Sequence, residues 1–206
     1  NKEQQTYIQP KHELGESPYR FNWQTPILLS SHNQDILYLG GNKLHRSMNQ
    51  GDDWTAISPD LTQGGKEGNV AYGTLSSISE SPFQFGLIYT GSDDGLVQIT
   101  KDSGASWNSI KGDWPANLWV SRVVSSQHKK ERVYVTLNGY RFDDFTTYVY
   151  KSDDYGQTWK SIGEALPTAP ANVIIEHPKK GNILFVGTDN ASYISTDTGA
   201  TWELLN

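Results

Sequence analysis

The sequence contains no cysteine, which excludes disulfides, thiolate metal sites and a cysteine nucleophile. It also contains no apolar run of the length that a membrane-spanning helix requires. Charged residues make up only 19% of the chain, the net charge is −6, and lysines and arginines form no extended cluster. Because nucleic acids and anionic membranes bind clustered positive charge, we expect neither nucleic acid nor a membrane as a partner.

Several catalytic signatures are missing as well. No Gly-rich phosphate loop precedes a helical stretch, and no Gly-x-Ser-x-Gly sequence occurs. The five histidines are isolated from one another, so we expect no metal site, and nothing indicates a cofactor. The chain begins at Asn1 without a signal peptide, and we expect it to be a processed or excised piece of a longer protein.

The chain does contain one eight-residue pattern that occurs four times. It reads hydroxyl residue, any residue, Asp or Asn, any residue, Gly, any residue, usually a hydroxyl residue, then Trp. The pattern predicts a tight hairpin, because the third side chain can accept bonds from turn amides and glycine tolerates positive φ. The Trp then begins the next strand as an apolar anchor. We therefore assign structural roles, not metal binding or catalysis, to Asn49, Gly51, Trp54, Asp102, Gly104, Trp107, Asp154, Gly156, Trp159, Asp197, Gly199 and Trp202.

We call each copy of this pattern a box, and the spacing of the four boxes predicts the fold. Successive box tryptophans are 53, 52 and 43 residues apart, which is the length of one propeller blade. Three strand-like runs precede each tryptophan and a fourth begins at it. The sequence thus predicts an all-β protein: an extended lead-in over residues 1–22, then a β-propeller segment over 23–206. Its four antiparallel four-stranded blades are expected at about 23–62, 70–112, 117–166 and 170–206.

The phase of the blades also bears on closure of the ring. Each unit begins at its first strand and the last one ends after its fourth, so no blade is shared between the termini. We expect an arc of a larger propeller, completed by the remaining blades of a longer chain or by a second copy. The alternative is a compact four-bladed ring.

The boxes and the motifs between them resemble the Asp-box (BNR-repeat) propellers of a bacterial family of exported glycosyl-hydrolase-like proteins. More distant resemblances are to sortilin-type receptors, xyloglucan-active glycoside hydrolases and photosystem assembly factors. The resemblance covers residues 19–206 and is carried by residues 20–27, 54–62, 89–100, 119–123 and 141–145. It implies a secreted or periplasmic protein in which this stretch is one section of a longer chain. It implies no particular reaction, since one fold hosts many functions.

Acidic residues outside the boxes are the weak candidates for catalysis. Most glycosidases need two facing carboxylates about 5 to 9.5 Å apart. Adjacent aspartates are more typical of turns, and an interblade salt bridge with Arg141 is the favoured role for the pair at 143 and 144. A sialidase is disfavoured because the chain has only five arginines and lacks the Arg-Ile-Pro signature. The catalytic candidates are Asp143, Asp144, Asp94 and Glu80, and Asp93 and Asp189 also follow blade strands.

A binding surface has stronger indications. The segment 138–145 is longer than a minimal hairpin and rich in aromatic and charged residues, which is typical of a binding loop. Trp114 is expected to be accessible in a loop between blades, and Arg122 to point from an innermost strand into the axial channel. Trp23 and Trp119 are expected to pack in the core. The candidate binding residues are Trp114, Arg122, Tyr140, Arg141 and Phe142.

Two functions remain open at this level. The first is a non-catalytic binding or scaffold segment of an exported propeller protein, which contacts a protein or a polysaccharide ligand through its axial face and the 138–145 insert. The alternative is part of a carbohydrate-active glycoside hydrolase whose partner acid lies in another blade or a second copy. Two non-box carboxylates converging within about 10 Å in a cleft would favour the hydrolase.

Overall fold

The chain folds into four antiparallel sheets of four strands, which follow one another along the sequence as blades 1 to 4. The computed structural model describes residues 7–68 and 70–205, so residues 1–6 of the expected lead-in and residue 206 of the expected last blade lie outside the described residues. Blade 1 comprises β1 (Ile27–Leu29), β2 (Leu37–Gly40), β3 (Leu44–Ser47) and β4 (Thr55–Ala56). Blade 2 comprises β5 (Leu75–Glu80), β6 (Ile88–Ser92), β7 (Val97–Thr100) and β8 (Asn108–Ile110).

The second half of the chain repeats this arrangement. Blade 3 comprises β9 (Trp119–Ser125), β10 (Val133–Asn138), β11 (Tyr148–Ser152) and β12 (Lys160–Ser161). Blade 4 comprises β13 (Ala171–Glu176), β14 (Leu184–Thr188), β15 (Ser192–Ser195) and β16 (Glu203–Leu204). The one helical element among the described residues is a single 3-10 turn, η1 (Tyr140–Phe142), between β10 and β11. In every blade the strands lie in chain order, so the prediction of an all-β fold with four four-stranded blades is confirmed.

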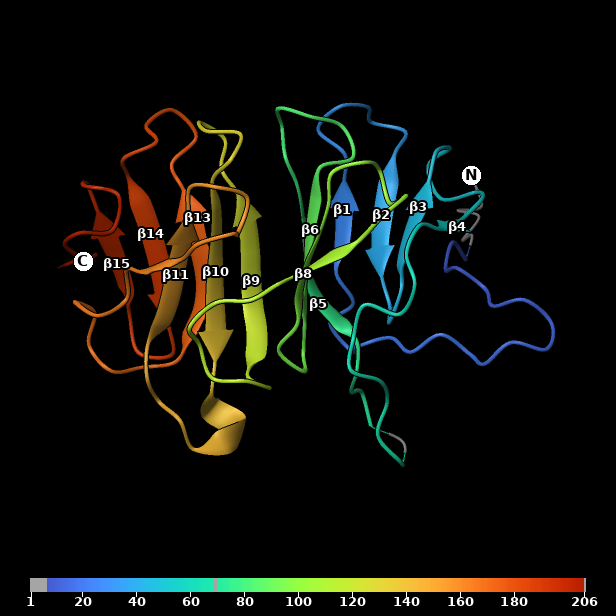
Figure 1. Cartoon of the computed structure of the whole chain (residues 1–206), viewed down its shortest axis with the longest axis horizontal. Helices are drawn as coiled ribbons and strands as arrows, with labels where there is room; N and C mark the ends of the chain where they lie inside the picture. The colour runs from blue at the N-terminus through green and yellow to red at the C-terminus, as the bar shows by residue number, and fades with distance from the viewer. Residues whose placement is uncertain (1–6, 69, 206) are drawn as a thin grey trace, which may run out of the picture.

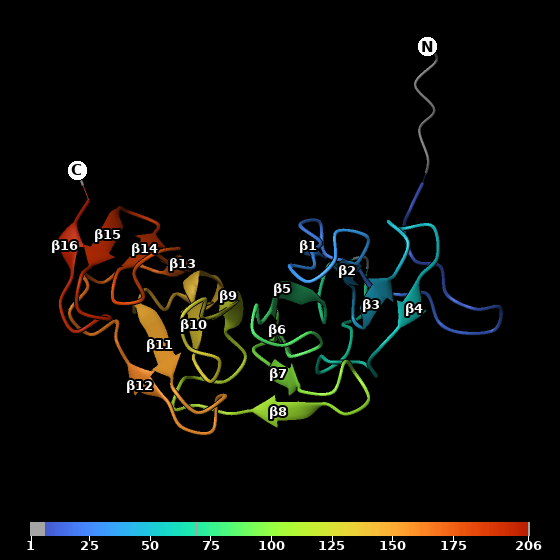
Figure 2. The same ribbon diagram turned by 90° about the horizontal axis from the view of Figure 1, so that it is seen from above.

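The blades stand side by side along an open arc (Figures 1 and 2). In the view from above, the first strands β1, β5, β9 and β13 line the concave side and the fourth strands lie outside (Figure 2). Blades 1 and 4 lie at the two ends of the arc and do not close a ring. The arc, and not the compact four-bladed ring, is therefore the arrangement of this chain.

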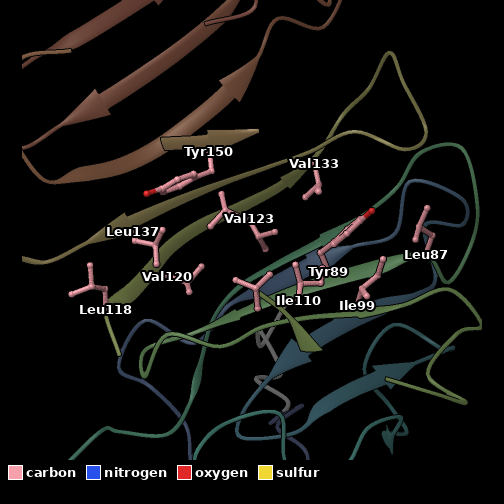
Figure 3. Close-up of a cluster of buried hydrophobic side chains, with 12 residues drawn as sticks. Leu87, Tyr89, Ile99, Ile110, Leu118, Val120, Val123, Val133, Leu137 and Tyr150 are labelled. Atoms are coloured by element: carbon pink, nitrogen blue, oxygen red, sulfur yellow. The ribbon is translucent and has the colours of Figure 1, made fainter. Parts of the chain in front are cut away.

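The apolar cores lie between consecutive blades, because both faces of an inner blade are covered by neighbours. Between blades 2 and 3, Leu87, Tyr89 and Ile99 face Val123 and Val133 (Figure 3). Similar clusters join blade 1 to blade 2 and blade 3 to blade 4. The four-blade arc thus has three interblade cores instead of one central core.

The described part of the lead-in lies against the outward face of blade 1. The Tyr19 ring meets the ring of buried His45 edge-on, with 4.5 Å between centroids. Arg20 forms an ion pair with Asp60 at 2.6 Å. These contacts hold the lead-in on a face that would otherwise be an open sheet surface.

Each Asp box forms the hairpin between the third and fourth strands of its blade. In the third box, Ser152 Oγ accepts a hydrogen bond from the Gly156 amide at 2.8 Å, and Asp154 accepts one from the Thr158 amide at 2.9 Å. Both Tyr155 and Gly156 have positive φ, at 63° and 87°. The sequence pattern predicted positive φ only for the glycine.

The box carboxylates are occupied within their own turns. The hydroxyl of Ser106, followed by its amide, lowers the pKa of Asp102 to about 2 by hydrogen bonding. The hydroxyl and amide of Thr201 lower the pKa of Asp197 to about 2 in the same way. Carboxyl groups with such pKa values stay ionised at neutral pH and have no proton to give as general acids.

Candidate functional site

A cavity of about 830 Å³ lies on the concave side of the arc. Inner strands from all four blades contribute to it, together with the insert between β10 and β11. Its volume lies within the usual range of ligand clefts, about 300 to 1,000 Å³. We call it the axial groove, and it is lined by Gln24, Pro26, Ile27, Ser76, Ile78, Trp119, Ser121, Arg122, Asn138, Tyr140, Arg141, Asn172 and Asp189.

Register irregularities in the inner strands turn polar residues into the groove. In each of β5, β9 and β13 one residue has no partner in the ladder with the second strand: Ser76, Ser121 and Asn172 respectively. A bulge of this kind bends the strand and re-aims its side chains. In β9 it allows the consecutive residues Ser121 and Arg122 both to line the groove. The sequence pattern did not predict these bulges, although they recur at corresponding positions of three blades.

Two of the bulge residues also tie neighbouring blades together. Ser76 Oγ of blade 2 donates to the Val120 carbonyl of blade 3 at 2.6 Å. Ser121 Oγ of blade 3 donates to the Ala171 carbonyl of blade 4 at 2.7 Å. The floor of the groove is therefore held by hydrogen bonds that cross from blade to blade.

A row of amide and carboxylate groups forms one side of the groove. Asn138 Nδ2 donates to Asn172 Oδ1 at 2.8 Å, and Asn172 Nδ2 donates to Asp189 Oδ1 at 2.7 Å. Asn138 Oδ1 in turn accepts the backbone amide of Tyr140 at 2.9 Å, which fixes the start of η1. This row joins blades 3 and 4 and orients the insert.

The insert places a guanidinium group against an indole. Arg141 Cζ lies 4.2 Å from the centroid of the half-buried Trp119 ring, a cation–π distance. Tyr140 is 61% exposed and lines the groove, whereas the exposed Phe142 does not. Arg122, on β9, is exposed within the same groove.

The expected salt bridge between Arg141 and the adjacent aspartates is not formed among the described residues, which corrects the sequence-based interpretation. Asp144 instead accepts the Tyr148 hydroxyl at 2.8 Å and the Thr146 amide at 3.0 Å. Asp143 follows η1 in the left-handed conformation, with φ of 55°. Arg141 stacks on the indole because η1 turns it toward β9, away from both carboxylates.

The other catalytic candidates have structural partners outside the groove lining. Buried Glu80 accepts hydrogen bonds from Ser30 Oγ at 2.6 Å and Tyr38 Oη at 2.8 Å, across the junction of blades 1 and 2. Asp94 accepts the Gln63 amide at 2.7 Å, and burial raises the pKa of its carboxyl group. Neither these two nor the aspartates at 143 and 144 line the groove, and Asp189 is the one carboxylate among its described lining residues.

Three tryptophans differ from their predicted environments. Trp114, expected to be accessible, is half-buried because its indole packs between the rings of Tyr150 and Trp159, at 5.2 and 5.1 Å between centroids. Trp23, expected to pack in the core, is 94% exposed and lies in a turn before β1. Trp119 is half-buried in the groove wall and not in an interblade core.

Across residues 7–68 and 70–205, no three His, Asp or Glu side chains come together in a way that could hold a metal ion. The same residues include no helix long and apolar enough to cross a membrane.

No protein-family model matches the chain. In sequence it is similar to a xyloglucanase of Hypocrea jecorina (strain QM6a), with 25% identity over 198 residues, which span 93% of this chain and 22% of that protein. The chain therefore spans about a fifth of the length of this relative.

Solved structures give the same picture of the fold. The GH74 xyloglucanase of Xanthomonas campestris superposes with a TM-score of 0.68 at 18% identity, over 87% of this chain and 29% of that one. The GH74 enzyme of Niastella koreensis gives 0.65 at 21% identity, over 86% and 28%. YCF48 from Cyanidioschyzon merolae gives 0.58 at 13% identity, over 93% and 57%. The chain thus has the fold of part of larger propellers, while the BNR-repeat and sortilin-type resemblances stay predictions.

Proposed function

We propose that the chain is a non-catalytic binding segment whose axial groove holds a glycan. The observation that carries the proposal is the joint placement of a stacked Arg141–Trp119 pair, the exposed Tyr140 ring and the row of side-chain amides in one groove. Sugars bind through stacking of their ring faces on aromatic side chains and through hydrogen bonds from their hydroxyls. The groove offers both kinds of contact on a concave surface.

The number of carboxylates in the groove supports glycan binding over glycan hydrolysis. Glycoside cleavage in most families uses a pair of carboxyl groups about 5 to 9.5 Å apart. Asp189 is the single carboxylate lining the described groove, and it accepts a hydrogen bond from Asn172. A second candidate function, part of a glycoside hydrolase, is favoured by the 25% identity to a xyloglucanase. It requires a second acid from outside the described residues.

The test is glycan binding to the chain and to a Tyr140→Ala variant. We expect the variant to bind about three- to tenfold more weakly, because an exposed stacking ring is removed without disturbing the fold. Phe83→Ala is the matched control, since Phe83 is 47% exposed and lies in a turn of blade 2 outside the groove. Equal affinities of the two variants would overturn the proposal. Release of reducing ends from xyloglucan that disappears in Asp189→Asn would establish the hydrolase instead.

A further inference from the structure

We propose that the glycan bound in the axial groove is anionic, and that Arg122 and Arg141 bind its carboxylate groups. The proposal rests on the function inferred above and names the ligand class: a polysaccharide that contains uronic acids. It follows from the absence of ion-pair partners for these two arginines among the described residues, the charge of the groove and the geometry of the stacked guanidinium group.

The arginines of the chain differ in whether their charge is already neutralised. Arg20 and Arg132 are each paired with an aspartate at 2.6 Å. Arg122 and Arg141 form no ion pair and donate no side-chain hydrogen bond within residues 7–68 and 70–205. A guanidinium group always carries its charge, so these two groups present unmatched positive charge to the groove.

The local charge of the groove is opposite to that of the whole chain. The chain has a net charge of −6, whereas the groove lining contains two arginines and one carboxylate. That carboxylate, Asp189, already accepts a hydrogen bond from Asn172. The described groove lining therefore carries one more positive than negative group, and this excess favours a ligand that brings acceptors with negative charge.

The stacking of Arg141 prepares it for such a ligand. Its guanidinium carbon lies 4.2 Å from the Trp119 ring centroid, so the indole restrains the side chain. A guanidinium stacked on a ring keeps its in-plane N–H groups available, and these match the two oxygens of a carboxylate. Because the side chain is already ordered, less conformational entropy is lost when the ligand binds.

The rest of the groove favours a sugar chain over an acidic peptide. Peptide recognition relies on apolar pockets for anchoring side chains. The apolar aliphatic lining is confined to Pro26, Ile27 and Ile78, next to the polar bulge residues. The amides of the asparagine row and the exposed Tyr140 ring suit hydroxyl groups and ring faces.

Calorimetric titration of the 206-residue chain tests the assignment. The probes are oligosaccharides of galacturonate, mannuronate and hyaluronate, each beside the same oligosaccharide with its carboxyl groups reduced to alcohols. We expect at least one uronate to bind at least about tenfold more tightly than its reduced form, since a charge-assisted hydrogen bond is lost on reduction. Binding should weaken between about 50 and about 300 mM salt, as expected for a partly exposed ionic contact.

Substitutions test whether the two groove arginines cause the preference for the charged oligosaccharide. Arg122→Gln and Arg141→Gln should each weaken uronate binding by about tenfold, and should weaken binding of the reduced oligosaccharide by clearly less, so that the preference for the charged form falls. Lys160→Gln removes the same charge from exposed β12, outside the groove, and should change neither. If reduced and charged oligosaccharides bind equally, the groove binds glycans but the anionic assignment is wrong. If no saccharide binds while a polyglutamate peptide does, or nothing binds, the proposed function fails as well.

Discussion

Two buried glutamates show at the scale of single residues how neighbouring blades are joined. Glu80 of blade 2 accepts the Tyr38 hydroxyl of blade 1 at 2.8 Å, and Glu176 of blade 4 accepts the Tyr134 hydroxyl of blade 3 at 3.0 Å. At the middle junction Tyr89 occupies the corresponding position, but blade 3 has Ser125 where blades 2 and 4 have glutamate. The Tyr89 hydroxyl is buried and has no partner among the described residues.

This difference predicts different outcomes for the same substitution. Tyr134→Phe should lower the free energy of unfolding by about 1 to 3 kcal/mol, because it leaves a buried Glu176 oxygen without that donor. Tyr89→Phe should leave the stability within about 0.5 kcal/mol or raise it, because the removed hydroxyl bonds to no described group. Urea unfolding of the two variants measures both effects. Equal losses would show that the hydroxyl of Tyr89 has a partner that these contacts do not include.

At the scale of the element, the Asp-box hairpins also dock on the blade before them. Trp107 Nε1 of blade 2 donates to the Ile57 carbonyl after β4 at 2.9 Å, and Trp202 Nε1 of blade 4 donates to the Ile162 carbonyl after β12 at 2.7 Å. Gly104 approaches the same Ile57 carbonyl so closely that a Cβ there would lie 2.3 Å from its oxygen. The box glycine is therefore required both for its positive φ and for contact between blades.

Gly104→Ala separates these two requirements when it is compared with Gly64→Ala. Both glycines have positive φ, 97° and 106°, but a Cβ at Gly64 would meet no atom within 4 Å. We expect Gly64→Ala to cost about 1 to 2 kcal/mol of backbone strain. Gly104→Ala should cost at least about 1 to 3 kcal/mol more, because its methyl group overlaps backbone of blade 1. Urea unfolding measures the difference, and equal costs would mean that the box does not dock tightly.

At the scale of the whole molecule, the described residues place no further blade against one face of blade 4. Ile175 pairs with Phe185 in the sheet as Val124 pairs with Tyr134 in blade 3, so the two aliphatic residues are at equivalent positions. Val124 packs into the core between blades 3 and 4, whereas Ile175 is 53% exposed. The same position of the repeat is thus partly buried against a core in one blade and exposed in the last.

A charge placed at these two positions distinguishes interior from surface. Val124→Lys should destabilise the chain by about 2 to 4 kcal/mol, since it puts a charge into an interblade core. Ile175→Lys should change the stability by no more than about 0.5 kcal/mol, as expected of an exposed site. Urea unfolding of the monomeric chain at low protein concentration is the measurement. A large loss in Ile175→Lys would show that blade 4 has a neighbour in solution.

The fold was predictable from the sequence because it is local and repeated. The box pattern specifies one hairpin by turn chemistry alone, and its spacing gives the length of a blade, so four copies determine four sheets and their strand order. The repeat also indicated that Asp102 and Asp197 have structural and not catalytic roles, since they recur at the same turn position.

The composition of the groove was decided by tertiary structure. Bulges at Ser76, Ser121 and Asn172 depend on strand pairing that no local pattern records. The environment of Arg141 depends on η1 turning it onto Trp119, in place of the salt bridge that sequence proximity to the aspartates suggested. Sequence alone determined the blades because each blade forms through contacts near in the chain. Only the packing of blade on blade determined which polar side chains face a common groove.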